Sequence, residues 1–171
     1  MLNKTYSSLL VKFPKETSSQ LLEWIRTEED RIIWSGNTFK KALSINSFTE
    51  HLNRTDLDSF AYFTPRNNLL TYGEVITNNS ATGSICRIIV NPMERSKGYG
   101  QIFCKDLLLW MKKKKKFNMA TFNTFADNQK AINCYRKIGF KIVARKPRSR
   151  KLGGVWKDMV VMKKAISHRN L

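Results

Sequence analysis

Residues 85–100 read ICRIIVNPMERSKGYG and join an apolar run to a turn that contains two glycines. The run from Ile85 to Val90 is nearly continuous in apolar residues, as expected for a strand buried on both faces. Asn91-Pro92 ends this strand, and the turn Arg95 to Gly100 leads into a helical stripe of apolar residues that begins at Tyr99. The first backbone N–H groups of a helix have no partner within it, and glycine lets phosphate oxygens approach the main chain. This strand, turn and helix therefore predict a pyrophosphate site.

A second stretch, one helix and one strand further on, has its own helical pattern. Residues 128–140 read NQKAINCYRKIGF and follow a strand predicted over Met119 to Thr124. Asp127 is placed to cap a helix with Tyr135 on its apolar face, and Gly139 is placed to end it. Closing strands are predicted over Phe140 to Ala144 and Val155 to Met162.

Upstream of residue 85, the sequence predicts two helices and then strands. Thr17 with Gln20, and Ser47 with Glu50, form capping-box patterns before apolar residues. Strands are predicted over Ser59 to Thr64 and Leu69 to Ile76, followed by a polar hairpin, Thr77 to Gly83. The order of elements predicts an α/β fold in which a mixed sheet is flanked by helices.

Composition places the chain among ordinary globular proteins. Its 171 residues are 42% apolar and 26% charged, which predicts one domain over residues 1–171 that folds without a disulfide framework. Three cysteines, Cys86, Cys104 and Cys134, form no CxxC pair and are expected to be reduced. The two histidines have no ligand pattern near them, so no metal site is predicted.

Neither a membrane span nor an export signal is evident. The longest apolar run, Leu107 to Met111, is much shorter than the roughly 18 residues that a membrane-spanning helix needs. The amino terminus lacks the unbroken apolar core of a signal peptide. The sequence therefore predicts a soluble, cytoplasmic protein with no membrane partner.

The charge is unusual, since 31 Lys and Arg against 13 Asp and Glu give a net charge of +18. Such a field attracts anions, whether nucleic acid, an acidic membrane surface or a phosphate-rich cofactor. The run Lys112 to Lys116 is expected to be a solvated helix end, where cations complement the helix dipole. The segment Ala144 to Lys151 is either an anion-contacting loop or a plain surface turn.

The two stretches together resemble the GNAT superfamily of N-acetyltransferases. The resemblance rests on Val90-Asn-Pro92, on R-x-x-G-x-G at 95–100 and on N-x-x-A-x-x-x-Y-x-x-x-G-F at 128–140, and it spans about Ile85 to Phe140. It implies the acyl-CoA N-acyltransferase fold of that family, whose mostly antiparallel sheet splays apart at the cofactor cleft. It also implies transfer of an acetyl group from acetyl-CoA to a primary amine by direct attack, with no covalent enzyme intermediate.

The resemblance also assigns the cofactor to particular positions. The pantetheine arm would lie along the strand at residues 88–90 like an added strand, and the pyrophosphate would sit on the amides of residues 95–100. Asn128 would contact the cofactor, and Tyr135 would lie near the thioester sulfur. The implied cofactor-binding residues are Ile88, Ile89, Val90, Arg95, Ser96, Lys97, Gly98, Tyr99, Gly100, Asn123, Asn128 and Tyr135. The alternative for Ile88, Val90 and Tyr135 is a purely apolar role in the core.

Tyr135 is the candidate general acid, because a phenol with a pKa near 10 lies only about 1.5 units above a thiol and is able to protonate the leaving sulfur. The base is less clear. Many relatives have a Glu five residues before the motif asparagine, but this chain has Asn123 there, which does not accept a proton. Glu74, or a water held by Asn123, is the candidate replacement. The alternative for Glu74 is a structural or surface carboxylate.

The acceptor and the partners are left open by the sequence. Trp34 and Phe39, in a loop predicted between the first two helices, either line an acceptor pocket or cover the core. The acceptor is a small-molecule or protein amine, an acidic macromolecular partner is possible, and the chain is a monomer or a homodimer. Two other functions remain: a basic nucleic-acid or ribosome-binding module, and a CoA-binding sensor without catalysis.

Overall fold

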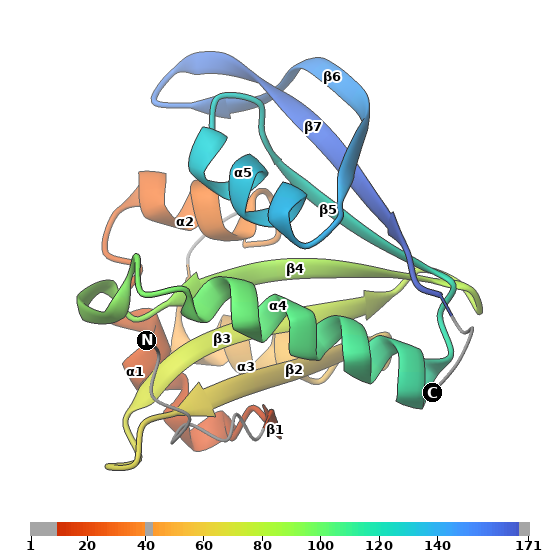
Figure 1. Cartoon of the computed structure of the whole chain (residues 1–171). Helices are drawn as coiled ribbons and strands as arrows, with labels where there is room; N and C mark the ends of the chain where they lie inside the picture. Colours follow the sequence, from red (N-terminus) through yellow and green to blue (C-terminus); the bar gives the residue numbers. More distant parts are fainter. Residues whose placement is uncertain (1–9, 40–42, 168–171) are drawn as a thin grey trace.

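The computed structural model describes residues 10–39 and 43–167. Within them seven strands form one sheet in the order β1-β2-β3-β4-β5-β7-β6, and all neighbours are antiparallel except β4 and β5, which are parallel. The strands are β1 (Val11–Lys12), β2 (Leu57–Phe63), β3 (Leu69–Thr77), β4 (Thr82–Val90), β5 (Met119–Phe125), β6 (Lys141–Leu152) and β7 (Val155–Ala165). The predicted mixed sheet flanked by helices is confirmed (Figure 1).

Helices cover both faces of this sheet and bury two apolar clusters. The helices are α1 (Ser18–Leu22), α2 (Glu28–Ser35), α3 (Ile45–Leu52), α4 (Tyr99–Trp110) and α5 (Gln129–Lys137), with single turns at Lys15–Thr17, Pro92–Glu94 and Met111–Lys115. One cluster lies under α4 and includes Phe60, Phe103 and Tyr135. The other lies under α1 and α3 and includes Leu21, Phe48 and Tyr72. Phe60 and Ala61, which are adjacent on β2, contribute to opposite clusters, as the alternation of side chains along a strand requires.

The parallel pair β4 and β5 separates soon after it starts. Only Thr82, Gly83 and Ser84 of β4 pair with β5, and beyond them the two strands diverge (Figure 1). The Oγ of Ser84 lies 2.6 Å from the Oγ1 of Thr121, so a hydrogen bond joins the strands at the last paired position. From Ile85 to Val90, one edge of β4 therefore faces an opening instead of a neighbouring strand. This is the splay that the family resemblance implies.

A β-bulge interrupts β4 beside this opening. Tyr72 pairs with Ile89 and Glu74 pairs with Cys86, so two residues of β4, Arg87 and Ile88, stand opposite Gly73. Arg87 has a φ of 52°, in the left-handed region that a bulge often uses. The bulge turns the side chain of Arg87 toward Glu74 and away from the normal alternation of the strand.

Some predicted elements differ at the amino-terminal end. α2 was not predicted; Thr27 and Asp30 form its capping box, and Trp34 lies in its last turn instead of in a loop. The Thr17 side chain does not cap α1, because its hydroxyl donates to the carbonyl of Pro14 at 2.7 Å, and Gln20 accepts from the N–H of Leu69. The capping box of α3 is formed by Ser44 and Ser47, three residues earlier than predicted.

Two further predictions are wrong in the carboxyl-terminal half. Asn128, not Asp127, caps α5, with its Oδ1 accepting from the N–H of Ala131. The segment 144–151 is not a loop but lies in β6, which is longer than the predicted strand and pairs with β7. Among the described residues, no helix is both long and apolar enough to cross a membrane.

Candidate active site

The turn before α4 presents backbone donors to solvent. Gly98 has a φ of 87°, which glycine adopts without strain, and serves as the N-cap of α4. The N–H groups of Arg95, Ser96 and Gly98 form no hydrogen bond with any described residue, and all three residues are exposed. Unpaired amides at a helix start attract anions.

Cations surround these amides. The Nε of Arg95 donates to the carbonyl of Val90 at 3.3 Å, which places its guanidinium beside the end of β4. Lys130, on α5, donates from Nζ to the Oγ of Ser96 at 3.1 Å, and Lys97 pairs with Glu94 at 2.8 Å. The contribution of Lys130 was missed from the sequence, because only the fold brings α5 over the turn. These positive groups and the free amides fit the pyrophosphate of a nucleotide cofactor.

A cavity of about 1200 Å³ connects this turn with the opening between β4 and β5. It brings together most of the predicted cofactor residues: Ile88, Ile89, Val90, Arg95, Ser96, Gly98, Tyr99, Gly100, Asn123, Asn128 and Tyr135. Lys97 is not part of the wall. The β4 edge at residues 88–90 has no strand partner on this side, so its main chain is available to an extended ligand.

Tyr135 lies on α5 with its ring against Phe122 of β5, and the ring centroids are 3.8 Å apart. The residue is 7% exposed, and its hydroxyl has no hydrogen-bond partner among the described residues. Burial raises the pKa of Tyr135 well above 10. The phenol therefore keeps its proton at physiological pH, as a proton donor must.

The two predicted asparagines also reach the cavity. The Oδ1 of Asn128 is used to cap α5, and its amide group has no other described partner. Asn123 is exposed on β5, in the part of the strand that has left β4 but still pairs with Val161 of β7. The position that carries a carboxylate in many relatives is thus part of the wall, and here it holds an uncharged amide.

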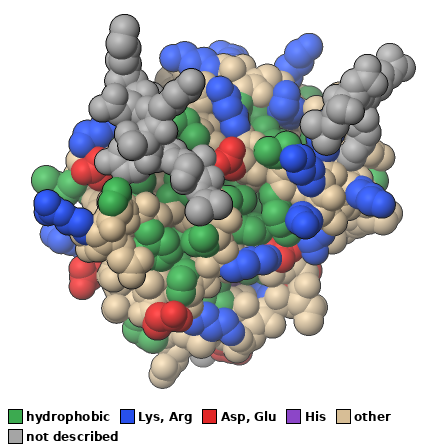
Figure 2. Space-filling view, turned by 60° about the horizontal axis from the view of Figure 1, so that its bottom comes forward, with side chains coloured by type: hydrophobic (Ala, Val, Ile, Leu, Met, Phe, Trp, Pro, Cys, Tyr) green, Lys and Arg blue, Asp and Glu red, His purple; other side chains and the backbone are tan. Residues whose placement is uncertain are grey.

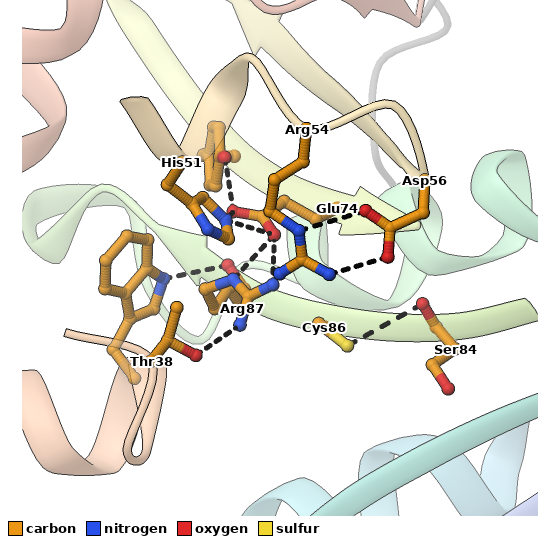
Figure 3. Close-up of polar contacts among 10 residues, drawn as sticks. Thr38, His51, Arg54, Asp56, Glu74, Ser84, Cys86 and Arg87 are labelled. Carbon is orange, nitrogen blue, oxygen red and sulfur yellow. Dashed lines mark hydrogen bonds and ion pairs between the residues drawn. The ribbon is translucent and has the colours of Figure 1, made fainter. Parts of the chain in front are cut away.

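Glu74 lies outside the cavity wall and is completely buried. It accepts hydrogen bonds from Tyr72 at 2.6 Å, from His51 Nε2 at 3.1 Å and from Arg87 Nε at 2.6 Å (Figure 3). Burial raises the pKa of Glu74, but the hydrogen bond from His51 and the charge of Arg87 outweigh it, and the pKa lies below its usual 4.5. Glu74 is therefore a charged, fully paired group with no free path to a substrate, and the geometry does not support its prediction as the base.

Of the two residues predicted to contact the acceptor, only one lines the cavity. Trp34 lines the cavity and donates from Nε1 to the carbonyl of Arg87 at 2.8 Å. Phe39 does not line it; its ring stacks behind Trp34 at an interplanar angle of 7° and is 5% exposed. Phe39 is therefore a core residue, and only Trp34 remains a candidate for acceptor contact.

A family model described as "Acetyltransferase (GNAT) family" matches residues 19–140. The chain belongs to the GNAT acetyltransferase family. This GNAT chain accordingly uses acetyl-CoA to acetylate an amine. No curated protein matches the chain in sequence.

Solved structures show the same fold. Spermidine N-acetyltransferase from Vibrio cholerae, in complex with CoA and spermine, has a TM-score of 0.79 and 15% identity, covering 92% of this GNAT chain and 94% of its own. A mutant of the same enzyme has a TM-score of 0.77 and 17% identity, covering 92% and 95%. At this level of identity the likeness establishes the architecture of the chain.

Proposed function

We propose that this enzyme acetylates a small-molecule primary amine inside the cavity between β4 and β5, by direct attack of the amine on the thioester. The observation that carries the proposal is that one cavity is lined by three features: the unpaired amides of Arg95, Ser96 and Gly98, the open edge of β4, and Tyr135. The cavity volume and its lining by Trp34 suit an acceptor of small size.

The residues that would hold acetyl-CoA follow from this geometry. The turn at residues 95–100, with Arg95 and Lys130, would bind the phosphates, and the main chain of residues 88–90 would bind the pantetheine arm. Acetyl-CoA supplies the acetyl group as an activated thioester. Tyr135 Oη holds the proton that the departing sulfur requires, and its raised pKa keeps that proton in place until then.

The amine must lose its charge before it attacks. Glu74 does not reach the cavity and Asn123 accepts no proton. The two carboxylates of the described wall already have partners, since Asp30 belongs to the capping box of α2 and Glu94 pairs with Lys97. We propose that the positive field of the chain, whose net charge is +18, disfavours an ammonium ion in the cavity and so lowers the pKa of the bound amine. Water near Asn123 then takes the proton.

The test is release of free CoA thiol from acetyl-CoA in the presence of single amines, amino acids, polyamines and peptide amino termini. We expect at least one acceptor class to give turnover that depends on both substrates. Binding of acetyl-CoA without turnover on any acceptor would instead support a CoA sensor, and no binding would refute the cofactor site. The three cysteines, none of them in a disulfide, support our placing the enzyme in the cytoplasm.

A further inference from the structure

A second irregularity in the sheet lies on β6, at the far side of the cavity from β4. Lys146 pairs with Met159 and Arg150 pairs with Lys157, so three residues, 147–149, stand opposite Asp158 alone. Asp158 holds this bulge, because its carboxylate accepts from the N–H of Arg148 at 2.9 Å and from Arg145 Nε at 2.9 Å. Bulges redirect the side chains that follow them, and the residue that follows this one is Arg150.

The guanidinium of Arg150 is turned into the cavity. It lies 5.9 Å from the ring of Phe125 and packs directly on Gly36, where an added Cβ would collide with it. The Nε of Arg150 is buried without a hydrogen-bond partner, and no described residue forms an ion pair with this group. A guanidinium that is partly removed from water and has no anion is costly, which indicates that a ligand supplies the anion.

The other charged groups of the wall already have partners or face solvent. Arg87 is paired with Glu74, and Glu94 is paired with Lys97. Asp30 belongs to the capping box of α2, and Lys130 reaches Ser96 at the phosphate turn. Lys137, near the end of α5, is exposed. Among the described residues of the wall, Arg150 is thus the cation that has a buried nitrogen and no anion.

The phosphates of the cofactor do not explain this group. The phosphate turn follows Val90, at the end of β4, whereas Arg150 packs on Phe125, at the end of β5. β4 and β5 pair only at their beginnings and diverge beyond them, and Arg150 contacts Gly36 and Phe125, not a residue of the phosphate turn. Arg150 therefore belongs to the side of the cavity that receives the acceptor, next to Trp34 and Gly36 of the α2 end.

We propose that Arg150 binds a carboxylate of the acceptor, so that the substrate is an amino acid or a similar small amine that carries a carboxylate. This rests on the proposed acetyltransferase function and names its acceptor class. A planar guanidinium binds a carboxylate through two parallel hydrogen bonds and so orients the amine as well as selecting it. A polyamine, which is a polycation, meets only two carboxylates among the described residues of this wall, Asp30 and Glu94, and both have partners.

The test compares amines that differ only in the carboxylate. Thiol release from acetyl-CoA is measured with L-alanine against ethylamine, L-lysine against cadaverine, and L-phenylalanine against phenethylamine. Spermidine is tested as a polycationic acceptor. O-phosphoethanolamine is compared with ethanolamine to test whether a phosphate replaces the carboxylate. We expect kcat/KM to favour the carboxylate member of at least one pair by about 10- to 100-fold, as for a hydrogen bond to a charged group.

Arg150→Gln should remove that preference, so that kcat/KM for the carboxylate member falls to that of the carboxylate-free amine, while the Kd for CoA changes by less than about twofold. The matched control is Arg148→Gln, which changes an exposed arginine of the same bulge that does not line the cavity and should keep the preference. Equal loss with both members of a pair, or a preference for spermidine or O-phosphoethanolamine, would overturn the proposal. A lower CoA affinity in Arg150→Gln would assign the group to the cofactor instead.

A binding measurement separates this proposal from the proposed function. Titration of N-acetyl-L-phenylalanine against N-phenethylacetamide, with CoA present, reports on Arg150 without any turnover. Tighter binding of the carboxylate, lost in Arg150→Gln, supports the anion site even if acetyl transfer fails on every acceptor. Equal or absent binding of the two compounds refutes it even if the enzyme acetylates other amines.

Discussion

Tyr135 is the residue on which the chemistry depends most directly. Replacing it with Phe keeps the ring packed on Phe122 but removes the proton donor, so we expect kcat to fall by about 100-fold or more. The KM for acetyl-CoA should change little, since the phenol is assigned to the leaving group and not to the phosphates. Steady-state kinetics with both substrates varied provide the measurement, and an unchanged kcat would remove Tyr135 from the mechanism.

The raised pKa of Tyr135 predicts a pH profile. Because burial holds this pKa above 10, the wild-type enzyme should show no decline of kcat from loss of the tyrosine proton as the pH rises from 7 to 10. An alkaline limb in that range that disappeared in Tyr135→Phe would show that the tyrosine ionises more easily than its burial implies.

Glu74 should matter for stability more than for proton transfer. Glu74→Gln leaves Arg87 with an uncompensated charge in a buried site, which should cost about 3–5 kcal/mol in the free energy of unfolding at pH 7. The folded-state pKa of Glu74 lies below 4.5, so the stabilising effect is complete above about pH 4.5 and is lost as the pH falls through the folded-state pKa.

Urea denaturation at several pH values measures this effect. The difference between wild type and Glu74→Gln should shrink as the pH falls below 4.5. Asp56→Asn is the control, because it removes an exposed ion pair with Arg54 and should change stability by less than about 1 kcal/mol. Equal stability of wild type and Glu74→Gln at pH 7 would contradict the role assigned to this pair.

At the scale of elements, comparing two glycine substitutions separates the role of the phosphate turn in CoA binding from the loss of stability that backbone strain causes. Gly98 and Gly153 both have positive φ values, 87° and 55°, and a Cβ added at either position would meet no atom within 4 Å. Gly98→Ala and Gly153→Ala should therefore each lose about 1 kcal/mol of stability. Only Gly98→Ala should also weaken CoA binding, because only that turn faces the cavity. Isothermal titration with CoA provides the comparison, and equal affinities would argue against the turn as the phosphate site.

Sequence patterns predicted the elements that carry strong local signals. Six elements lie close to their predicted ranges: β2, β3, β4, β5, α4 and α5. In these elements the apolar periodicity and the Pro and Gly residues at the ends indicate the same boundaries. The splay came from the family resemblance, and local pattern alone does not specify where two parallel strands separate. α2 was missed although Thr27 and Asp30 form a capping box, since Gly36 and Asn37 directly after it favoured a loop.

The two bulges explain why part of the site was hidden from the sequence. A strand pattern assumes that side chains alternate, whereas Arg87 and Arg150 are both redirected by extra residues in their strands. The same limit applies to Glu74, whose burial depends on partners from α3 and β4 that are distant in sequence. For the candidate site residues, burial was therefore the property that the sequence predicted least well.

For the whole molecule, the net charge of +18 should act on cofactor binding. Figure 2 shows Lys and Arg side chains spread among hydrophobic ones over the face it presents, and not merged into one stripe. A general positive field of this kind raises the association rate of an anion such as CoA and is weakened by salt. We expect kcat/KM for acetyl-CoA to fall as the ionic strength rises, with kcat nearly constant, and a flat dependence would contradict this.

Saturating CoA should also stabilise the fold as a unit, because the cavity is lined by residues of α2, β4, β5, α5 and β6. At a concentration 100 times the Kd, the expected gain is about 2.7 kcal/mol in the free energy of unfolding. Thermal unfolding with and without CoA measures it, at low and high salt. A shift in Tm that vanished completely at high salt would indicate adsorption of the anion to the surface instead of seating in the cavity.

The hydrogen bond from Trp34 to the carbonyl of Arg87 ties the helix beside the acceptor to the strand that bears the cofactor edge. Arg87 is in turn anchored by Glu74, and Glu74 by His51 and Tyr72, none of which borders the cavity. Selection for variants with a new amine preference should consequently yield changes at His51 and Tyr72, positions that no inspection of the pocket lining would nominate.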